Sequence, residues 1–377
     1  MSPMTATDLL YSDTEEALRD SVRRLFADRC PPELVARAYD ADAPAPQVFS
    51  DIWRTLAAEL GVAGLLVPES LGGAGASARE AAVVMEEIGR AVAPVPFFSS
   101  AVLATVALLR VGETETLSEL AKGALTAALV MPLSTAPGDP VSGVSIGANG
   151  LTGQVSSVAG AGEADVLVVP VAGPDGLELH TVSRTAAGVE VLPLLALDMT
   201  RPLADVRFSG AASSRVGPAG TSVAGIEAAL ETGAALLASE QLGLAQWCFE
   251  TTLAYAKERK QFGRAIGSYQ AIKHRLADLW FEVSAATSAA RYAADTCARG
   301  DADATVAAAI AQAYCSGIAV HVAEECVQLH GGIGMTWEYP AHLYLKRAKS
   351  DQLALGTAYR HRSRLAELVD LPVSPPS

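Results

Sequence analysis

The sequence predicts an α+β fold in three successive parts and a short tail. A helical N-terminal domain (1–120) precedes a small, mainly antiparallel β domain (121–220), and a C-terminal four-helix bundle (221–371) follows. Apolar residues recur at helical spacing in the first and third parts, whereas short apolar runs between Gly, Pro, Ser and Asp fill the middle. The Pro-containing end (372–377) predicts a disordered tail.

In the N-terminal part, apolar residues three and four positions apart predict amphipathic helices that turn one face to a core. Leu18, Val22 and Leu25 show this spacing. Pro31-Pro32 and the Gly-rich segment 69–77 interrupt it, so we expect several helices joined by ordinary loops.

The middle and third parts differ in the length of their apolar segments. Short runs in the middle predict strands at 127–131, 166–171, 177–182 and 189–192. Long Ala-rich amphipathic segments in the third part predict helices at 225–259, 269–299, 302–329 and 340–369. Four long helices of this kind favour a bundle.

Composition excludes several classes of site. The 28 Lys and Arg residues against 42 Asp and Glu residues give a net charge of −14, which disfavours nucleic acid as a partner. The five cysteines form no CxxC pair, so neither a disulfide framework nor a zinc site is indicated. We expect no metal site, because the His, Asp and Glu residues do not cluster at ligand spacing.

The sequence also indicates where the protein works. Its first residues lack a basic region followed by an apolar block, so a secretion signal is not visible. The strongly apolar stretches are too short to span a bilayer or are interrupted by polar residues, as 306–322 is by Gln312, Ser316 and His321. We therefore expect a cytoplasmic protein without membrane insertion.

Two segments of the third part carry a family resemblance. They read ERKQFGRAIGSYQAIKHRLADLW (258–280) and QLHGGIGMTWEYPAHLYLKRAKSDQLALGT (328–357). Together with LGVAGLLVPESLGGAGAS (60–77) and MEEIGRA (85–91), they resemble the acyl-CoA dehydrogenase family. The resemblance implies FAD bound at a subunit interface, α,β-dehydrogenation of an acyl-CoA thioester, and an electron-transfer flavoprotein as the electron acceptor.

In such relatives the β domain of one subunit holds the flavin ring, and a neighbour's helical domain holds the adenosine and pyrophosphate. The neighbour side is intact here, with a guanidinium fork, amide groups, an aromatic side chain and approachable glycine backbone. The resemblance assigns FAD binding to Arg259, Gln261, Phe262, Gln270, Gln328, Gly331, Gly332, Gly334 and Thr357. The structural alternative is a solvated helix end followed elsewhere by an ordinary glycine turn.

The ring side departs from the family pattern. Relatives carry a Thr-Glu-Pro run and then a Trp-containing strand, whereas this chain reads MPLSTAPGDPVSG (131–143) and LTGQVSSVAGAGEAD (151–165). No Trp occurs between Trp53 and Trp247. Ser134, Thr135 and Ser157 can still donate hydrogen bonds, but the aromatic wall is missing.

The catalytic base of the family is also missing at both of its usual positions. Leu355 stands where many relatives carry the glutamate of Tyr-Glu-Gly-Thr, and Gly233 stands where others place it. Glu240 lies two helical turns after Gly233, roughly 10 Å along the axis. It is a candidate base in an apolar segment, and the structural alternative is a buried carboxylate that is paired.

These losses suggest a division of labour. The chain keeps what would reach a neighbour's FAD and lacks what would serve its own. This favours a partner subunit in a heteromeric acyl-CoA dehydrogenase for fatty or sterol side-chain acyl-CoA, and symmetry favours an assembly of four subunits. One alternative is an autonomous homo-oligomeric enzyme that uses Glu240 as base. Another is a flavin-dependent oxidase or monooxygenase on the same fold, and a scaffold without flavin is disfavoured by the intact motifs.

Overall fold

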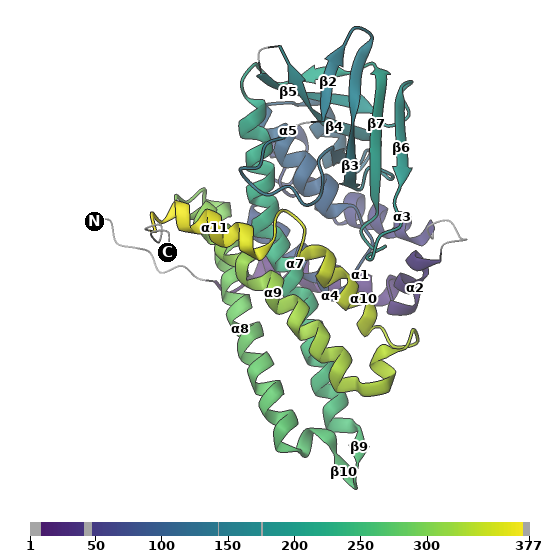
Figure 1. Cartoon of the computed structure of the whole chain (residues 1–377), viewed down its shortest axis with the longest axis vertical. Coiled ribbons are helices and arrows are strands. Elements are labelled where there is room, and N and C mark those ends of the chain that lie inside the picture. The colour runs from purple at the N-terminus through teal and green to yellow at the C-terminus, as the bar shows by residue number, and fades with distance from the viewer. Residues whose placement is uncertain (1–8, 41–46, 142, 175, 372–377) are drawn as a thin grey trace, which may run out of the picture.

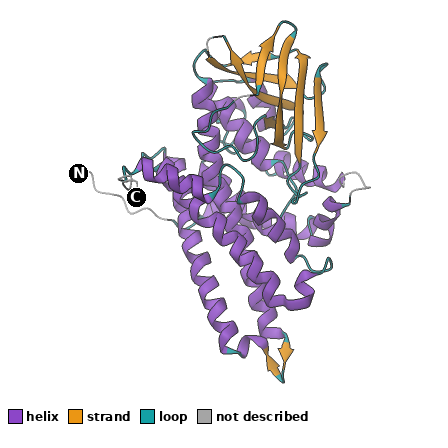
Figure 2. Cartoon of the chain, viewed as in Figure 1, coloured by secondary structure: helices purple, strands orange, loops and turns teal. Residues whose placement is uncertain are grey.

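The computed structural model describes residues 9–40, 47–141, 143–174 and 176–371 (Figure 1). The predicted tail (372–377) lies outside these residues. Most strands gather in one domain at one end of the molecule, a short two-stranded hairpin lies at the opposite end, and helices make up most of the remainder (Figure 2). The predicted order of a helical part, a β part and a helical bundle is confirmed.

One largely buried helix of the N-terminal part packs against the bundle. The helices of this part are α1 (Asp13–Arg29), α2 (Pro32–Ala36), α3 (Gln47–Arg54), α4 (Ala78–Ala91), α5 (Thr105–Val111) and α6 (Glu115–Ala121). Capping boxes start two of them, with Ser12 and Glu15 at α1 and Ser77 and Glu80 at α4. Most of α4 is buried, which places this helix between the N-terminal helices and the bundle.

The β domain is one sheet in which nearly all neighbours are antiparallel. Its strands are β1 (Ala127–Leu129), β2 (Val144–Gly147), β3 (Gly150–Ala159), β4 (Val166–Gly173), β5 (Gly176–Ser183), β6 (Val189–Pro193), β7 (Leu203–Ala211) and β8 (Ser214–Val216). Their order is β6-β7-β3-β2-β4-β5-β8, and β1 lies parallel beside β4. β2 meets β4 through a single parallel pair, Ser145 with Ala172.

The strands that stand out least in the sequence are β3 and β7. β3 alternates buried residues such as Leu151 and Val155 with exposed polar ones, so its apolar residues never form a run. β7 shows the same alternation, with Val206 and Phe208 buried. Both strands turn one face to a second core inside the β domain, and this burial fixes their register.

The C-terminal part contains three long helices and two short ones. They are α7 (Ser222–Glu258), α8 (Gln270–Arg299), α9 (Ala304–His330), α10 (Ala341–Asp351) and α11 (Ala358–Leu368). The fourth helix predicted at 340–369 is therefore two helices, α10 and α11. The break follows from the backbone at Leu355 (φ +52°) and Gly356 (φ +97°), since neither conformation can continue a right-handed helix.

α4 crosses α7 with the two backbones in direct contact. A Cβ atom on Gly243 of α7 would overlap the carbonyl oxygen of Glu86, and one on Gly89 of α4 would overlap that of Glu240. Each helix thus supplies a glycine where the other approaches. This crossing holds the N-terminal part against the bundle beside Glu240.

α9 is the most apolar long helix among the described residues. The stretch Ala304–Met335 is long and apolar enough to cross a membrane by length and composition alone, but 61% of its most apolar window is buried inside the protein. Its main contacts are with α7 and α8. This burial is typical of the central helix of a bundle.

Candidate active site

The residues assigned to a neighbour's FAD gather at one end of the bundle. α7 and α9 run in the same direction and α8 runs back, so the ends of α7 and α9 lie near the start of α8 (Figure 1). Tyr255 near the end of α7 ties this end together. Its ring centroid lies 4.4 Å from that of His330 in α9, and its hydroxyl donates to the His330 carbonyl oxygen at 3.5 Å.

A short hairpin presents an aromatic side chain to the outside. β9 (Lys260–Gln261) pairs with β10 (Arg264–Ala265), and Phe262 sits at the tip with φ +52°. The Phe262 side chain is 94% exposed. An aromatic side chain held outward on an ordered hairpin is typical of a binding surface. The assigned residues Arg259, Gln261, Gln270 and Gln328 are also exposed at this end.

The glycine-rich turn after α9 has two different kinds of glycine. A Cβ atom on Gly331 or Gly332 would meet no heavy atom within 4 Å, so a ligand can approach this exposed backbone. Gly334 is buried, and a Cβ atom there would lie 2.5 Å from the Val327 carbonyl oxygen. Gly331 and Gly332 therefore fit a ligand-binding role, whereas packing alone accounts for Gly334.

Thr357 belongs to a different place in the molecule. It is the residue before α11, and its hydroxyl accepts from the backbone N–H of Arg360 at 3.5 Å. This is an N-cap. The structure does not bring Thr357 together with the residues at the ends of α7 and α9.

The two usual base positions face each other across an apolar contact. A Cβ atom on Gly233 of α7 would lie 2.9 Å from a methyl carbon of Leu355 and 2.6 Å from one of Leu103. Leu355 is buried, and its backbone is fixed by a 2.7 Å hydrogen bond from its N–H to the Leu133 carbonyl oxygen. The cavity beside these side chains measures about 10 Å³. It offers no group that accepts a proton and no room for an acyl chain.

Glu240 is fully buried, and both of its carboxylate oxygens are engaged. One guanidinium nitrogen of Arg201 donates to them at 2.7 and 2.6 Å, and Arg347 Nε lies 3.2 Å from Oε1. The adjoining cavity measures about 20 Å³, enough for one water molecule and far too small for an acyl group. These contacts match the structural alternative for Glu240 and argue against its use as a base.

Two further carboxylates complete this buried ion cluster. Arg201 donates to Asp351 at 2.5 Å from its other terminal nitrogen, and Arg347 lies 3.3 Å from Asp198. Burial, followed by the nearby charge of Glu240, raises the pKa of Asp351 to about 7. The cluster joins the β6–β7 connection, α7 and α10.

Sequence reasoning missed four of the five members of this cluster. Glu240 was visible as a charge in an apolar segment, and such a residue needs a partner. Its partners could not be named, because Arg201 lies 39 residues earlier, on the far side of two β strands and a turn. The charged residues of α10 look like an ordinary polar helix face in sequence.

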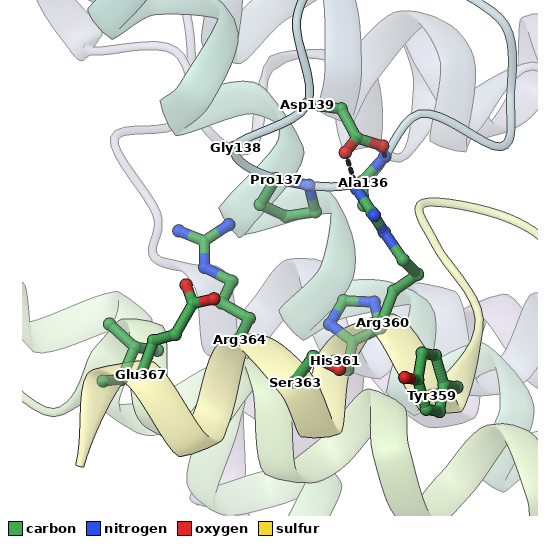
Figure 3. A pocket seen from close by; sticks show the side chains of 11 residues that line it. Ala136, Pro137, Gly138, Asp139, Tyr359, Arg360, His361, Ser363, Arg364 and Glu367 are labelled. Carbon is green, nitrogen blue, oxygen red and sulfur yellow. Dashed lines mark hydrogen bonds and ion pairs between the residues drawn. The ribbon is translucent and has the colours of Figure 1, made fainter. Parts of the chain in front are cut away.

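The segment that corresponds to the ring side in relatives is held against both α11 and α7. Asp139 forms an ion pair with Arg360 of α11 (Figure 3). The N–H of Gly138 donates to Glu227 of α7 at 2.9 Å. An open pocket of about 600 Å³ lies between residues 136–139 and one face of α11. Arg364, which also lines this pocket, is paired with Glu227.

The two sides of the predicted FAD site therefore fit the cofactor differently. The bundle end offers a guanidinium, amides, an exposed aromatic ring and open glycine backbone, a donor set that suits adenosine and pyrophosphate. Across the described part of the β domain, by contrast, no tryptophan side chain is available to wall a flavin ring. The residues at the bundle end therefore fit the adenosine and pyrophosphate side of FAD.

Comparisons with known proteins agree with this geometry. The chain matches the acyl-CoA dehydrogenase N-terminal domain over residues 12–126 and the C-terminal domain over residues 220–369. It is 35% identical to the acyl-CoA dehydrogenase IpdE2 of Mycolicibacterium smegmatis, over 94% of this chain and 98% of the relative.

Two solved complexes are also similar. The ChsE4-ChsE5 complex from Mycobacterium tuberculosis is 26% identical with a TM-score of 0.84, covering 98% of this chain and 100% of that one. The Tcur3481-Tcur3483 steroid ACAD variant is 27% identical with a TM-score of 0.82, covering 95% and 98%. The fold, the cofactor-side motifs and these matches together show that the chain belongs to the acyl-CoA dehydrogenase family, FAD-dependent oxidoreductases that act on acyl-CoA.

Proposed function

We propose that this chain is one subunit of a heteromeric acyl-CoA dehydrogenase. It holds the adenosine and pyrophosphate side of an FAD whose ring lies against a second, different subunit, and that subunit supplies the catalytic base. One contrast carries the proposal: the neighbour-facing residues Arg259, Gln261 and Phe262 are exposed, whereas Gly233 and Leu355 are packed against each other.

Each residue at the bundle end has a role in this assembly. The Arg259 guanidinium offers two parallel donors to the pyrophosphate, and Gln261 and Gln270 offer amide donors and acceptors. Phe262 covers an apolar face of the cofactor or of the second subunit. The open backbone at Gly331 allows N–H groups to reach phosphate or ribose oxygens.

Proton abstraction falls to the second subunit. FAD, when bound, supplies the hydride acceptor for the β carbon of the acyl group. A base must come within hydrogen-bond reach of the α proton, and neither Gly233 nor Leu355 carries an acceptor. Glu240 is paired with the guanidinium groups of Arg201 and Arg347, so its carboxylate is not free to accept the proton.

The proposed substrate is an acyl-CoA derived from a sterol. The support is the similarity to a steroid ACAD and to the ChsE4-ChsE5 complex, both named for two components. The proposed electron acceptor is an electron-transfer flavoprotein, and the proposed location is the cytoplasm.

The FAD content of the purified protein tests this proposal. The chain alone is expected to be colourless, and co-expression with the second subunit is expected to give about one FAD per pair. Arg259→Ala in this chain is expected to release FAD from the complex. Lys257→Ala, an exposed cation two residues earlier, is the matched control and is expected to retain it.

Three outcomes would contradict the proposal. FAD bound at one equivalent by the chain alone would favour the autonomous enzyme, and activity that vanishes in Glu240→Gln with FAD retained would assign the base to this chain. Oxygen consumption on supply of reduced flavin, without acyl-CoA oxidation, would favour the oxidase or monooxygenase.

A further inference from the structure

A separate pocket lies between the N-terminal helices and the bundle, away from the residues discussed above. It measures about 280 Å³ and is formed by α1, the start of α2, α4, α7 and α10. An engineered apolar cavity of about 150 Å³ holds benzene, so this pocket has room for a ring system of about two fused rings. Neither the base positions nor the neighbour-facing residues line it.

The inner wall of the pocket is aromatic. Trp247 of α7 and Tyr344 of α10 are stacked, with centroids 3.6 Å apart and planes 4° from parallel. Tyr344 and Phe26 are buried, whereas Trp247 is only partly buried, which leaves part of the stacked pair accessible. Tyr344 holds Trp247 in place, and a flat ring placed against the accessible part of Trp247 gains apolar contact and stacking.

The remaining floor is also apolar. Cys30 lines the pocket beside Pro31 and Pro32. Burial raises the pKa of the Cys30 thiol to about 12, so the thiol stays protonated and behaves as a small apolar group. The two prolines supply rigid ring carbons and no N–H donors.

The polar groups around the pocket are already satisfied within the chain. Arg23 donates to Glu87 through two hydrogen bonds, at 2.9 and 2.6 Å. Arg90 donates to Glu250 at 2.6 Å and its carbonyl oxygen accepts from the Tyr344 hydroxyl at 2.7 Å. Two cations and two anions cancel, so the rim offers no net charge to an ionic ligand.

We propose that this pocket is a binding site for a small, uncharged aromatic molecule of one or two fused rings. The volume of the pocket, its aromatic wall and the paired charges at its rim all favour this class of ligand. The site is independent of the proposed FAD arrangement and is expected whether or not a second subunit is present.

Indole is the probe that tests the site, and indole-3-carboxylate is its charged counterpart. Indole is expected to bind the full chain, detected by ligand-observed NMR and by isothermal titration calorimetry. Ala27→Phe is expected to fill the pocket and weaken binding by about ten-fold or more. Ala27 is exposed on α1 and lines the pocket, so this variant is expected to fold.

Ala17→Phe is the matched control, because Ala17 is also exposed on α1 but does not line the pocket. It is expected to bind indole as the wild type does. Absence of indole binding, equal binding by Ala27→Phe, or tighter binding of the carboxylate would each overturn the proposal. So would loss of second-subunit binding in Ala27→Phe without any indole binding, since the pocket would then be a protein contact.

Discussion

Arg201 donates to both carboxylate oxygens of Glu240, at 2.7 and 2.6 Å, from a single guanidinium nitrogen. Its other terminal nitrogen donates to Asp351. Arg201 precedes β7, Glu240 lies in α7 and Asp351 ends α10, so one side chain joins the β domain to two helices of the bundle. The relationship makes Glu240 part of the junction between domains.

Glu240→Gln is expected to destabilise the chain by about 3 kcal/mol, because removal of one partner from a buried ion cluster leaves the other charges uncompensated. Chemical unfolding of the purified chain measures this. Glu250→Gln is the matched control, since Glu250 pairs with Arg90 at an exposed site, and it is expected to cost less than about 1 kcal/mol. Equal stability of Glu240→Gln and wild type would remove the structural role assigned to Glu240.

The titration of Asp351 is expected to make the protein more stable at mildly acidic pH. Its pKa is about 7 in the folded chain, mainly through burial, against about 3.9 for an unfolded aspartate. Between about pH 4 and pH 7 the folded chain therefore holds a proton that the unfolded chain has lost, and the free energy of unfolding falls as pH rises through this window.

Asp351→Asn tests this contribution. The variant is less stable overall, since it loses an ion pair with Arg201, but its loss of stability from about pH 5 to pH 8 is expected to be smaller than that of the wild type. His361 acts in the opposite direction, because burial lowers its pKa to about 4. Both proteins contain His361, so its effect cancels when the pH dependence of the free energy of unfolding is compared between Asp351→Asn and the wild type. An identical pH dependence in the two proteins would contradict the prediction.

The contact of α4 with α7 predicts that two glycines of α7 respond differently to the same substitution. Gly243→Ala places a methyl group onto the Glu86 carbonyl oxygen, a backbone atom that cannot move alone, and is expected to cost about 3 kcal/mol or more. Gly233→Ala meets only methyl ends of Leu103 and Leu355, and the gain of about 1 kcal/mol in helix propensity offsets their shift. Thermal unfolding of both variants measures the difference. An equal loss of stability in the two variants would show that α4 and α7 can move apart to accommodate the added methyl group.

The parts of this structure that were predictable from sequence are those set by neighbouring residues. The helical spacing of α1, α4 and α7 and the contiguous cofactor-side motifs each depend on short stretches of chain. The motifs at the ends of α7 and α9 came together because these two helices pack side by side and run in the same direction. The domain order and the family resemblance followed in the same way.

Other features depend on long-range packing and left little local signal. The break between α10 and α11 is marked in sequence only by Gly356, and the left-handed backbone of Leu355 is held by the Leu133 carbonyl oxygen from a distant loop. The Arg201 cluster likewise joins three elements that no periodicity connects. β3 and β7 were inconspicuous because exposed polar residues alternate with their buried ones.

Leu355→Glu asks whether restoring the family's glutamate restores catalysis to this chain. It is expected to add no dehydrogenase activity to the chain alone, because the ring side remains altered and the new carboxyl enters an apolar contact with Gly233 and Leu103. Burial there raises the pKa of a carboxyl group and disfavours the ionised base. The complex with the second subunit is expected to keep its activity, measured by acyl-CoA-dependent dye reduction. Leu355→Gln is the control of equal shape, and activity that appears in the lone Glu variant but not in the Gln variant would show that this chain retains a working site of its own.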